Sequence, residues 1–364
     1  MEESSLRTVR LALLALTIAC ALAVDLFGIL PKAVEGPRNG DFSTFYVAGR
    51  INRRLVYDFA AVTRAQEPIV GRLESARPYL NPPTYLPLLE LLAKAPIGVG
   101  LFLWATLTTA LFLAACLSVA APRVVLLAAI SPVVWSTAAG GQVAMLVGAC
   151  IIGAIASLER RPLLAGALFA VAALIKPPAV TLVPLALVAC RQWKALAACL
   201  LTGVAAGLAS ISVYGLDIWL HWLAALHAFT DFLRFSDVIE KGVSPATLAR
   251  LAGMGAPAAL AFQIACAILG VAVVWRVFRG SSAPLHRLAA LTTGCLLVTP
   301  YAMTQELAPM LAAAATLLLA PRAHPLFWFA SFLVLASLAA PIGVILMGLG
   351  LLLVPDGNSV NGKA

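Results

Sequence analysis

Charged residues are scarce in this sequence. Only 11% of its 364 residues are Asp, Glu, Lys or Arg, whereas 62% are hydrophobic, and the mean hydropathy is +0.97. A water-soluble globule needs more polar surface than this composition supplies. The sequence therefore excludes a soluble fold and predicts an all-α, polytopic membrane protein whose helices are surrounded by lipid.

Metal-ligand and nucleotide-binding motifs are also lacking. The sequence has no P-loop, no glycine-rich dinucleotide turn, no HExxH and no GxSxG in a usable context. The cysteines lie in apolar segments without CxxC spacing, so we interpret them as small packing residues, and the histidines show no ligand spacing. We therefore expect neither a metal site nor a cofactor. The residues concerned are Cys20, Cys116, Cys150, Cys190, Cys199, Cys266, Cys295, His221, His227, His286 and His324.

The net charge of +9 is not gathered into a basic tract with interleaved aromatic residues. In a membrane protein a positive balance usually reflects cytoplasmic loop anchors and contacts with lipid phosphates. We therefore expect membrane lipids, and not nucleic acid, among the partners.

Apolar runs divide the chain into about 12 predicted spans. The first, 11–30, contains a signal-peptide-like Ala21-Leu22-Ala23, but it continues beyond that point, which predicts a retained transmembrane helix. Asp25 near its outer end either snorkels to the interface or faces an interior cavity. Several later runs are shorter than the roughly 20 residues of a full crossing, as is typical of helices that border a cavity. These runs are 101–119, 124–138, 143–158, 163–175, 179–189, 195–214, 257–277, 288–299, 308–320 and 327–354, the last divided by Pro341.

Counting spans from a cytoplasmic N-terminus places the basic short loops on one side and the unusual polar stretches on the other. We expect one membrane-embedded domain, 1–364, with a first outer loop at 31–96 and a second at 215–255. The second loop predicts another interfacial helix, in which Trp219 and Trp222 are interpreted as anchors in preference to sugar-stacking platforms. The predicted cytoplasmic residues are Arg123, Glu159, Arg160, Arg161, Arg191, Lys194, Arg276, Arg279, Arg287 and Arg322.

The first outer loop is polar where its neighbours are apolar. At a helical period, aromatic side chains share one side of residues 40–58 and three arginines share another, which predicts an amphipathic helix on the membrane surface. A second amphipathic segment is expected at 58–71. The loop has nine basic residues against six acidic ones, so we expect an anionic partner. The basic residues are Lys32, Arg38, Arg50, Arg53, Arg54, Arg64, Arg72, Arg77 and Lys94, and the acidic ones are Glu35, Asp41, Asp58, Glu67, Glu74 and Glu90.

These residue types suit chemistry at a lipid phosphate. Asp41 lies within a turn or two of several guanidinium groups, beside a bilayer that can deliver phosphate-bearing lipids. A carboxylate can take the proton from an acceptor hydroxyl while cations stabilise a departing phosphate. The combination favours transfer of a group from a phosphate-linked lipid.

Several short motifs in a fixed order resemble glycosyltransferase family 87. Each is weak alone, and the resemblance, spread over about residues 25–325, depends on their shared order. The motifs are Gly40-Asp41-Phe42 with Tyr46 and Ala48, Val56-Tyr57-Asp58, Leu80-Asn81-Pro82-Pro83, Gly141-Gln142, Lys176-Pro177-Pro178, Thr299-Pro300-Tyr301 and Gln305-Glu306-Leu307.

The resemblance implies a GT-C-like membrane enzyme, an inverting hexosyltransferase that uses a polyprenyl-phosphate sugar, most often mannose. It implies transfer to a lipid or glycan acceptor on the periplasmic face of a bacterial inner membrane. It also implies an Asp in the first outer loop as general base, and that base maps to Asp41.

Each candidate residue has a simpler interpretation as well. Asp41 is alternatively the N-cap of a helix beginning at Phe42, with Asp58 and Glu306 as the other candidate carboxylates. We expect four cations to bind the donor phosphate: Lys176, Arg50, Arg53 and Arg54. The alternative is that Lys176 extends to the membrane interface and that the arginines bind phospholipid headgroups nonspecifically. We expect a set of polar residues to bind the sugar or the acceptor: Asn81, Tyr85, Gln142, Tyr301, Gln305 and Glu306. The alternative is that they form hydrogen bonds with backbone groups left unpaired where helices are broken.

A lipid or lipid-linked-sugar transporter or flippase is the rival interpretation, and a non-catalytic polysaccharide-assembly subunit is a third. Secondary transporters usually bury ionisable groups near the membrane midplane and show internal repeats. Here the ionisable residues lie at segment ends and no repeat is visible. The sequence therefore favours the enzyme.

Overall fold

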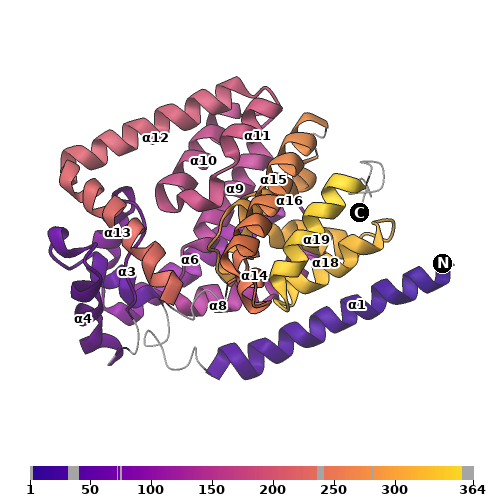
Figure 1. The fold of residues 1–364 in the computed structure, drawn as a ribbon, viewed down its shortest axis with the longest axis horizontal. Helices are drawn as coiled ribbons and strands as arrows, with labels where there is room; N and C mark the ends of the chain where they lie inside the picture. The colour runs from indigo at the N-terminus through magenta and orange to yellow at the C-terminus, as the bar shows by residue number, and fades with distance from the viewer. Residues whose placement is uncertain are drawn as a thin grey trace.

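The computed structural model describes residues 3–31, 41–71, 73, 76–235, 242–280 and 283–354. Within these ranges the chain forms helices and no β-strand, and its one extended pairing is an isolated bridge between Gly242 and Met303. The all-α prediction is confirmed. The helices, drawn in Figure 1, are α1 (Glu3–Val24), η1 (Asp25–Ile29), α3 (Phe42–Ala48), η3 (Arg53–Leu55), α4 (Phe59–Val70), η4 (Pro83–Tyr85), α5 (Leu86–Leu92), α6 (Ile97–Leu117), α7 (Pro122–Ala129), α8 (Pro132–Gly140), α9 (Ala144–Ser157), α10 (Pro162–Ile175), η5 (Pro177–Val180), α11 (Val183–Ala189), α12 (Trp193–Tyr214), α13 (Leu216–Phe235), α14 (Pro245–Leu251), α15 (Ala256–Gly280), α16 (Pro284–Val298), η7 (Thr304–Met310), α17 (Leu311–Leu319), α18 (Pro325–Leu335) and α19 (Ala340–Leu353).

Four helices in the described ranges are long and apolar enough to cross a membrane: α1 continued by η1, α6, α12 and α15. α7 and α8 together make a fifth candidate, bent by 61° at their junction. Pro132 opens α8 and has no N–H to continue the ladder of α7, which explains the break. The expected count of 12 spans is not confirmed, because seven further apolar helices have only 10–17 residues each.

The long helices lie on the outside and several short ones inside. Only 6% of the apolar window of α12 is buried, and leucines such as Leu201 and Leu208 point away from the protein. Figure 1 shows α1 along one edge of the molecule and α12 along another. By contrast, α16 is buried along nearly its whole length, its polar residues included.

The segment 42–55 differs from the continuous helix expected there. α3 ends at Ala48, and a separate 3₁₀ turn, η3, begins at Arg53 with the Asn52 side chain accepting from the Arg54 N–H at 3.0 Å. Gly49 is the C-cap of α3, and its backbone lies against α5, where an added Cβ would come within 2.3 Å of the Leu89 carbonyl oxygen. The expected helical stripe of three arginines is therefore wrong, and most of α3 is enclosed by protein.

Several residues predicted for the cytoplasmic side contact other helix ends. Arg287 of α16 pairs with Glu159 at the end of α9, and the Glu159 carboxylate also accepts from Gln192 before α12 at 3.2 Å. Arg10 of α1 donates to the Leu319 carbonyl at the end of α17, at 2.6 Å. These contacts join helix ends that the span count placed on one side, and the alternation of the helices across the membrane stays a prediction.

Candidate active site

Asp41 stands at the start of α3, and its carboxylate is directed away from that helix. The residue occupies the N-cap position, where its backbone carbonyl accepts from the Thr44 N–H at 2.9 Å, but its side chain makes no capping hydrogen bond. Instead, Oδ2 accepts a hydrogen bond from Nε2 of Gln142. Asp58 behaves in the opposite way, because its Oδ1 caps α4 by accepting from the Ala61 N–H at 2.9 Å, as expected for that residue.

The turn between α8 and α9 brings Gln142 to Asp41. Gly141 ends α8 with φ of +63°, a left-handed conformation that favours glycine, and an added Cβ there would lie 2.6 Å from Cβ of Phe42. Trp104 of α6 fixes the same turn by donating to the Gly141 carbonyl at 3.0 Å. The glycine thus allows the turn to touch α3 next to the carboxylate.

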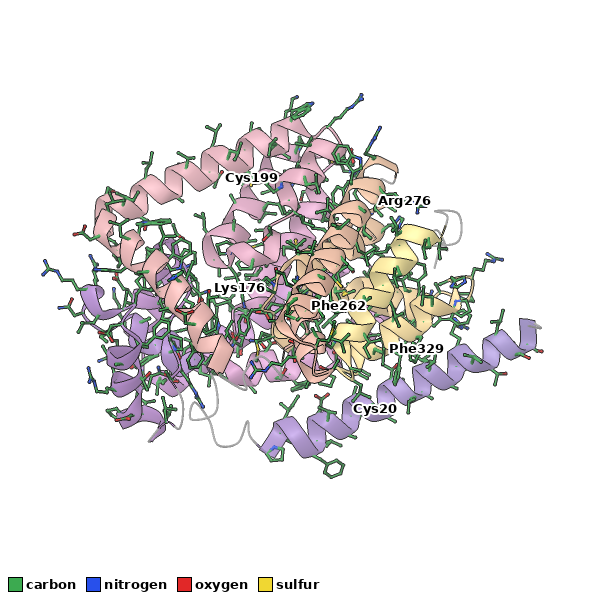
Figure 2. All side chains as sticks on the ribbon, viewed as in Figure 1. Cys20, Lys176, Cys199, Phe262, Arg276 and Phe329 are labelled. Atoms are coloured by element: carbon green, nitrogen blue, oxygen red, sulfur yellow. The ribbon has the colours of Figure 1, made fainter. Side chains whose placement is uncertain are left out.

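A second polar pair, Lys176 with Glu306, comes from two other broken helices. Lys176 follows the last residue of α10, and its Nζ forms an ion pair with Oε1 of Glu306 in η7. The other carboxylate oxygen of Glu306 accepts from the Met303 N–H, which fixes the side chain at the start of η7. Figure 2 shows Lys176 in the middle of the view, between α13 and α15.

The loop before η4 supports the end of α10. Pro177 and Pro178 have no N–H with which to continue that helix, so its last carbonyls need other donors. The Asn81 amide donates to the Ile175 carbonyl at 2.9 Å, and the Thr84 hydroxyl donates to the Leu174 carbonyl at 2.6 Å. Asn81 thus forms a hydrogen bond with the backbone of a broken helix, which was the alternative to sugar binding, and it holds the backbone just before Lys176.

Burial raises the pKa of Asp41 above its usual range, although the residue keeps an exposed surface. Arg77 and the Gln142 hydrogen bond act in the other direction, as does Lys176, while Glu306 adds to the rise. The pKa of Tyr301 is raised by burial first, and then by the carboxylates of Glu306 and Asp41. These mutual effects place Tyr301 and both carboxylates in one neighbourhood.

Arg77 belongs to this neighbourhood and was not among the residues singled out from the sequence. Of the charged groups that act on Asp41, it lowers the pKa most. The only signal for it was its membership of the nine basic residues in the first loop, and nothing in the spacing distinguishes it from the other eight.

The three other expected phosphate-binding arginines lie elsewhere. Arg50 donates to the Tyr46 hydroxyl and to the Ala93 carbonyl, both at 2.9 Å, beside an open pocket that it lines with Lys94. Arg53 pairs with Glu90 at 3.1 Å and stacks over the Tyr214 ring. Arg54 is exposed in η3. None of the three has a contact with Asp41, Lys176 or Glu306 in the described part of the chain.

Two of the expected sugar-binding residues occupy different surroundings. Tyr85 lies in an aromatic cluster with Phe45 and Trp104, and its hydroxyl is buried there. Gln305 is half-buried in η7 next to Glu306. In α13, the predicted interfacial helix, Trp222 donates to the Leu80 carbonyl at 2.9 Å and packs edge-on against Trp219. This contact holds α13 beside the loop that supports Lys176.

In the described ranges, no three His, Cys, Asp or Glu side chains gather in a group that could hold a metal ion. The functional groups that do meet are one exposed carboxylate, an amide, a second carboxylate, two cations and a phenol. They reach one neighbourhood from the start of α3, the α8–α9 turn, the end of α10, the segment before η4 and the region around η7.

A comparison with protein-family models decides the class of protein. The model for glycosyltransferase family 87 matches residues 79–300, which is more than half of the 364-residue chain. The chain belongs to glycosyltransferase family 87. A search of curated proteins finds no match, and a search of solved structures finds none either.

Membership of family 87 makes this protein a glycosyltransferase, with a sugar donor and an acceptor as substrates. Its apolar helices make it a membrane protein. The matched region contains Asn81, Gln142 and Lys176 but begins after Asp41 and ends before Glu306. The role of Asp41 therefore rests on the geometry of the site.

Proposed function

We propose that this glycosyltransferase transfers a hexose, with mannose as the leading candidate, from a polyprenyl-phosphate donor to a hydroxyl group of a lipid or glycan acceptor. In a bacterial cell the reaction would take place on the periplasmic face of the inner membrane. The observation that carries the proposal is the Asp41 carboxylate. It is exposed, it does not cap α3, and it lies among charged and polar groups that shift its pKa.

In the proposed mechanism Asp41 accepts the proton of the acceptor hydroxyl. The acceptor oxygen forms a bond to the anomeric carbon while the bond from that carbon to the phosphate oxygen breaks. Polyprenyl phosphate leaves with the bonding electron pair, and cations of the site stabilise its negative charge. One displacement from the face opposite the phosphate inverts the anomeric configuration.

Gln142 and Glu306 have supporting roles in this proposal. Gln142 donates to Asp41, which favours the ionised carboxylate and fixes its orientation. Glu306 holds Lys176 near the base while no donor is bound. Tyr301 remains a candidate for contacts with sugar or acceptor hydroxyls because both carboxylates act on it, and Gln305 remains one only as the chain neighbour of Glu306 in η7.

A transfer assay in liposomes tests this function. The purified protein is supplied with polyprenyl-phosphate mannose and a mixed acceptor extract, and both released polyprenyl phosphate and the anomeric form of the product are measured. We expect release, with a product anomer opposite to that of the donor. A product with the donor's anomeric form would contradict the single displacement, and no release from any polyprenyl-phosphate sugar in a panel would contradict the donor class.

A further inference from the structure

The guanidinium group of Arg77 has an N–H donor with no acceptor in the described part of the protein. Its Nη1 is buried and has no hydrogen-bond partner there. Leaving a buried polar group unpaired costs about 1–3 kcal/mol, and more for a charged group. Such a group calls for an explanation, and a bound anion would supply the missing partner.

The backbone of Arg77 is fastened to the helix that begins beside Asp41. Nε2 of the buried Gln66 donates to the Arg77 carbonyl at 3.0 Å. Oε1 of the same side chain accepts from the hydroxyls of Ser43 and Thr44, each at 3.0 Å. One amide of α4 therefore joins residue 77 to the first turn of α3, two or three residues after the candidate base.

The neighbouring charges of the site are already paired, in contrast to Arg77. Lys176 is engaged by Glu306, and the Asp41 carboxylate accepts from Gln142. Arg77 is near enough to influence Asp41 without forming a hydrogen bond to it in the described structure. The guanidinium of Arg77 therefore does not orient Asp41 through a hydrogen bond.

We infer that Arg77 binds the phosphate of the lipid-linked donor and, with Lys176, forms the two-cation subsite that holds this group as it leaves. The inference rests on the proposed function and assigns the subsite to a residue that the sequence did not distinguish. A guanidinium offers a planar fork of N–H donors that matches two phosphate oxygens, whereas neutral sugar hydroxyls need no buried cation. Arg50, Arg53 and Arg54 are given no part in this subsite.

The test is binding of polyprenyl phosphate, which is the expected product and carries the group in question without the sugar. Affinity is measured by ligand-dependent thermal stabilisation of the purified full-length protein in lipid nanodiscs. Polyprenol of the same length and inorganic phosphate serve as the two comparison ligands. The variants are Arg77→Gln and Arg77→Lys, with Arg64→Gln, an exposed arginine of α4, as the matched control.

We expect Arg77→Gln to raise the dissociation constant for polyprenyl phosphate about 10- to 100-fold, the range for losing hydrogen bonds to a charged group. Arg77→Lys should recover part of the affinity because it restores the charge without the fork. Arg64→Gln should bind as the wild type does. Polyprenol should bind weakly to every variant, because it lacks the phosphate.

Three outcomes would overturn the inference. Unchanged affinity in a folded Arg77→Gln variant would remove Arg77 from the subsite while leaving the proposed transfer reaction standing. Inorganic phosphate that binds as tightly as polyprenyl phosphate would assign the site to free phosphate. If Arg77→Gln does not fold, a donor KM for Arg77→Lys equal to that of the wild type would decide against it. By contrast, a wild type that neither binds polyprenyl phosphate nor transfers sugar would contradict the proposed function itself.

Discussion

At the residue scale, the surroundings of Asp41 determine when it can act as a base. Burial holds its pKa above the usual carboxyl range, and nearby cations reduce the rise without abolishing it. Only the ionised form can accept a proton. We therefore expect the transfer rate to increase with pH through this raised pKa and to level off above it.

Gln142→Leu should move that pH dependence. The Gln142 hydrogen bond lowers the pKa of Asp41, so its removal should raise the pKa further and shift the rise in rate to higher pH. The measurement is the pH profile of kcat/KM, with Gln192→Leu as a control at the opposite end of the molecule. An unshifted midpoint in Gln142→Leu would show that this amide does not act on the base.

Gly141→Ala should destabilise the protein. The new Cβ would meet Cβ of Phe42 at 2.6 Å, and the residue would have to keep a φ of +63°. The left-handed conformation alone costs roughly 1–2 kcal/mol, and overpacking costs about 1–3 kcal/mol more. Thermal unfolding should show a clear loss for Gly141→Ala, whereas Gly140→Ala, whose Cβ would meet nothing closer than 3.7 Å, should change little. Equal effects of the two substitutions would contradict this account of the turn.

At the element scale, the site depends on short pieces of chain fastened to one another. Gln66 is an example, since three hydrogen bonds of its one buried amide connect α4 to α3 and to the segment before η4. Asn81, just before η4, and Thr84, within η4, in turn fasten the end of α10. These contacts replace the regular backbone hydrogen bonds that the broken helices lack.

Gln66→Leu should therefore loosen two parts of the site together. Leaving buried hydroxyl and carbonyl groups unpaired costs about 1–3 kcal/mol each. We expect a lower unfolding temperature together with a higher KM for the donor, while Glu67→Gln at the exposed neighbouring position should behave as wild type. Lower stability with an unchanged donor KM would indicate that Gln66 supports the fold without positioning Arg77.

The sequence predicted much of this at the level of elements. Apolar runs located most of the long helices, and the prolines after Lys176 and at 341 marked real breaks. The end of α3 at Gly49 was missed, as was the packing of Gly49 against a carbonyl of α5 about forty residues away in the chain. Arg77 was missed because it lies in an irregular segment, where neither a period nor a motif separates it from other arginines. Both depend on tertiary contacts that local patterns do not encode.

At the scale of the whole molecule, two polar clusters in the described residues come from loops predicted for opposite sides of the membrane. Glu159 contacts Arg287 and Gln192 in one cluster, and the candidate active site around Asp41 forms the other. This division accords with the excess of Arg and Lys in the loops predicted to face the cytoplasm.

Labelling of introduced cysteines tests the division. Arg54 and Arg160 are both exposed and belong to opposite sides in the predicted topology. A membrane-impermeant thiol reagent added to intact inverted vesicles should label Arg160→Cys and not Arg54→Cys, and vesicles of the native orientation should give the reverse. Labelling of both variants from the same side would contradict the topology and with it the periplasmic site.

The central claim is that Asp41 is the base, and its most direct test compares two carboxylate-to-amide substitutions in one loop. Asp41→Asn should lower the rate of polyprenyl-phosphate release about 10²- to 10⁴-fold, the usual contribution of general base catalysis, while polyprenyl-phosphate binding persists. Asp58→Asn should stay close to wild type, because Asn also caps a helix well. Near-normal release by Asp41→Asn, or an equal loss in both variants, would contradict the account.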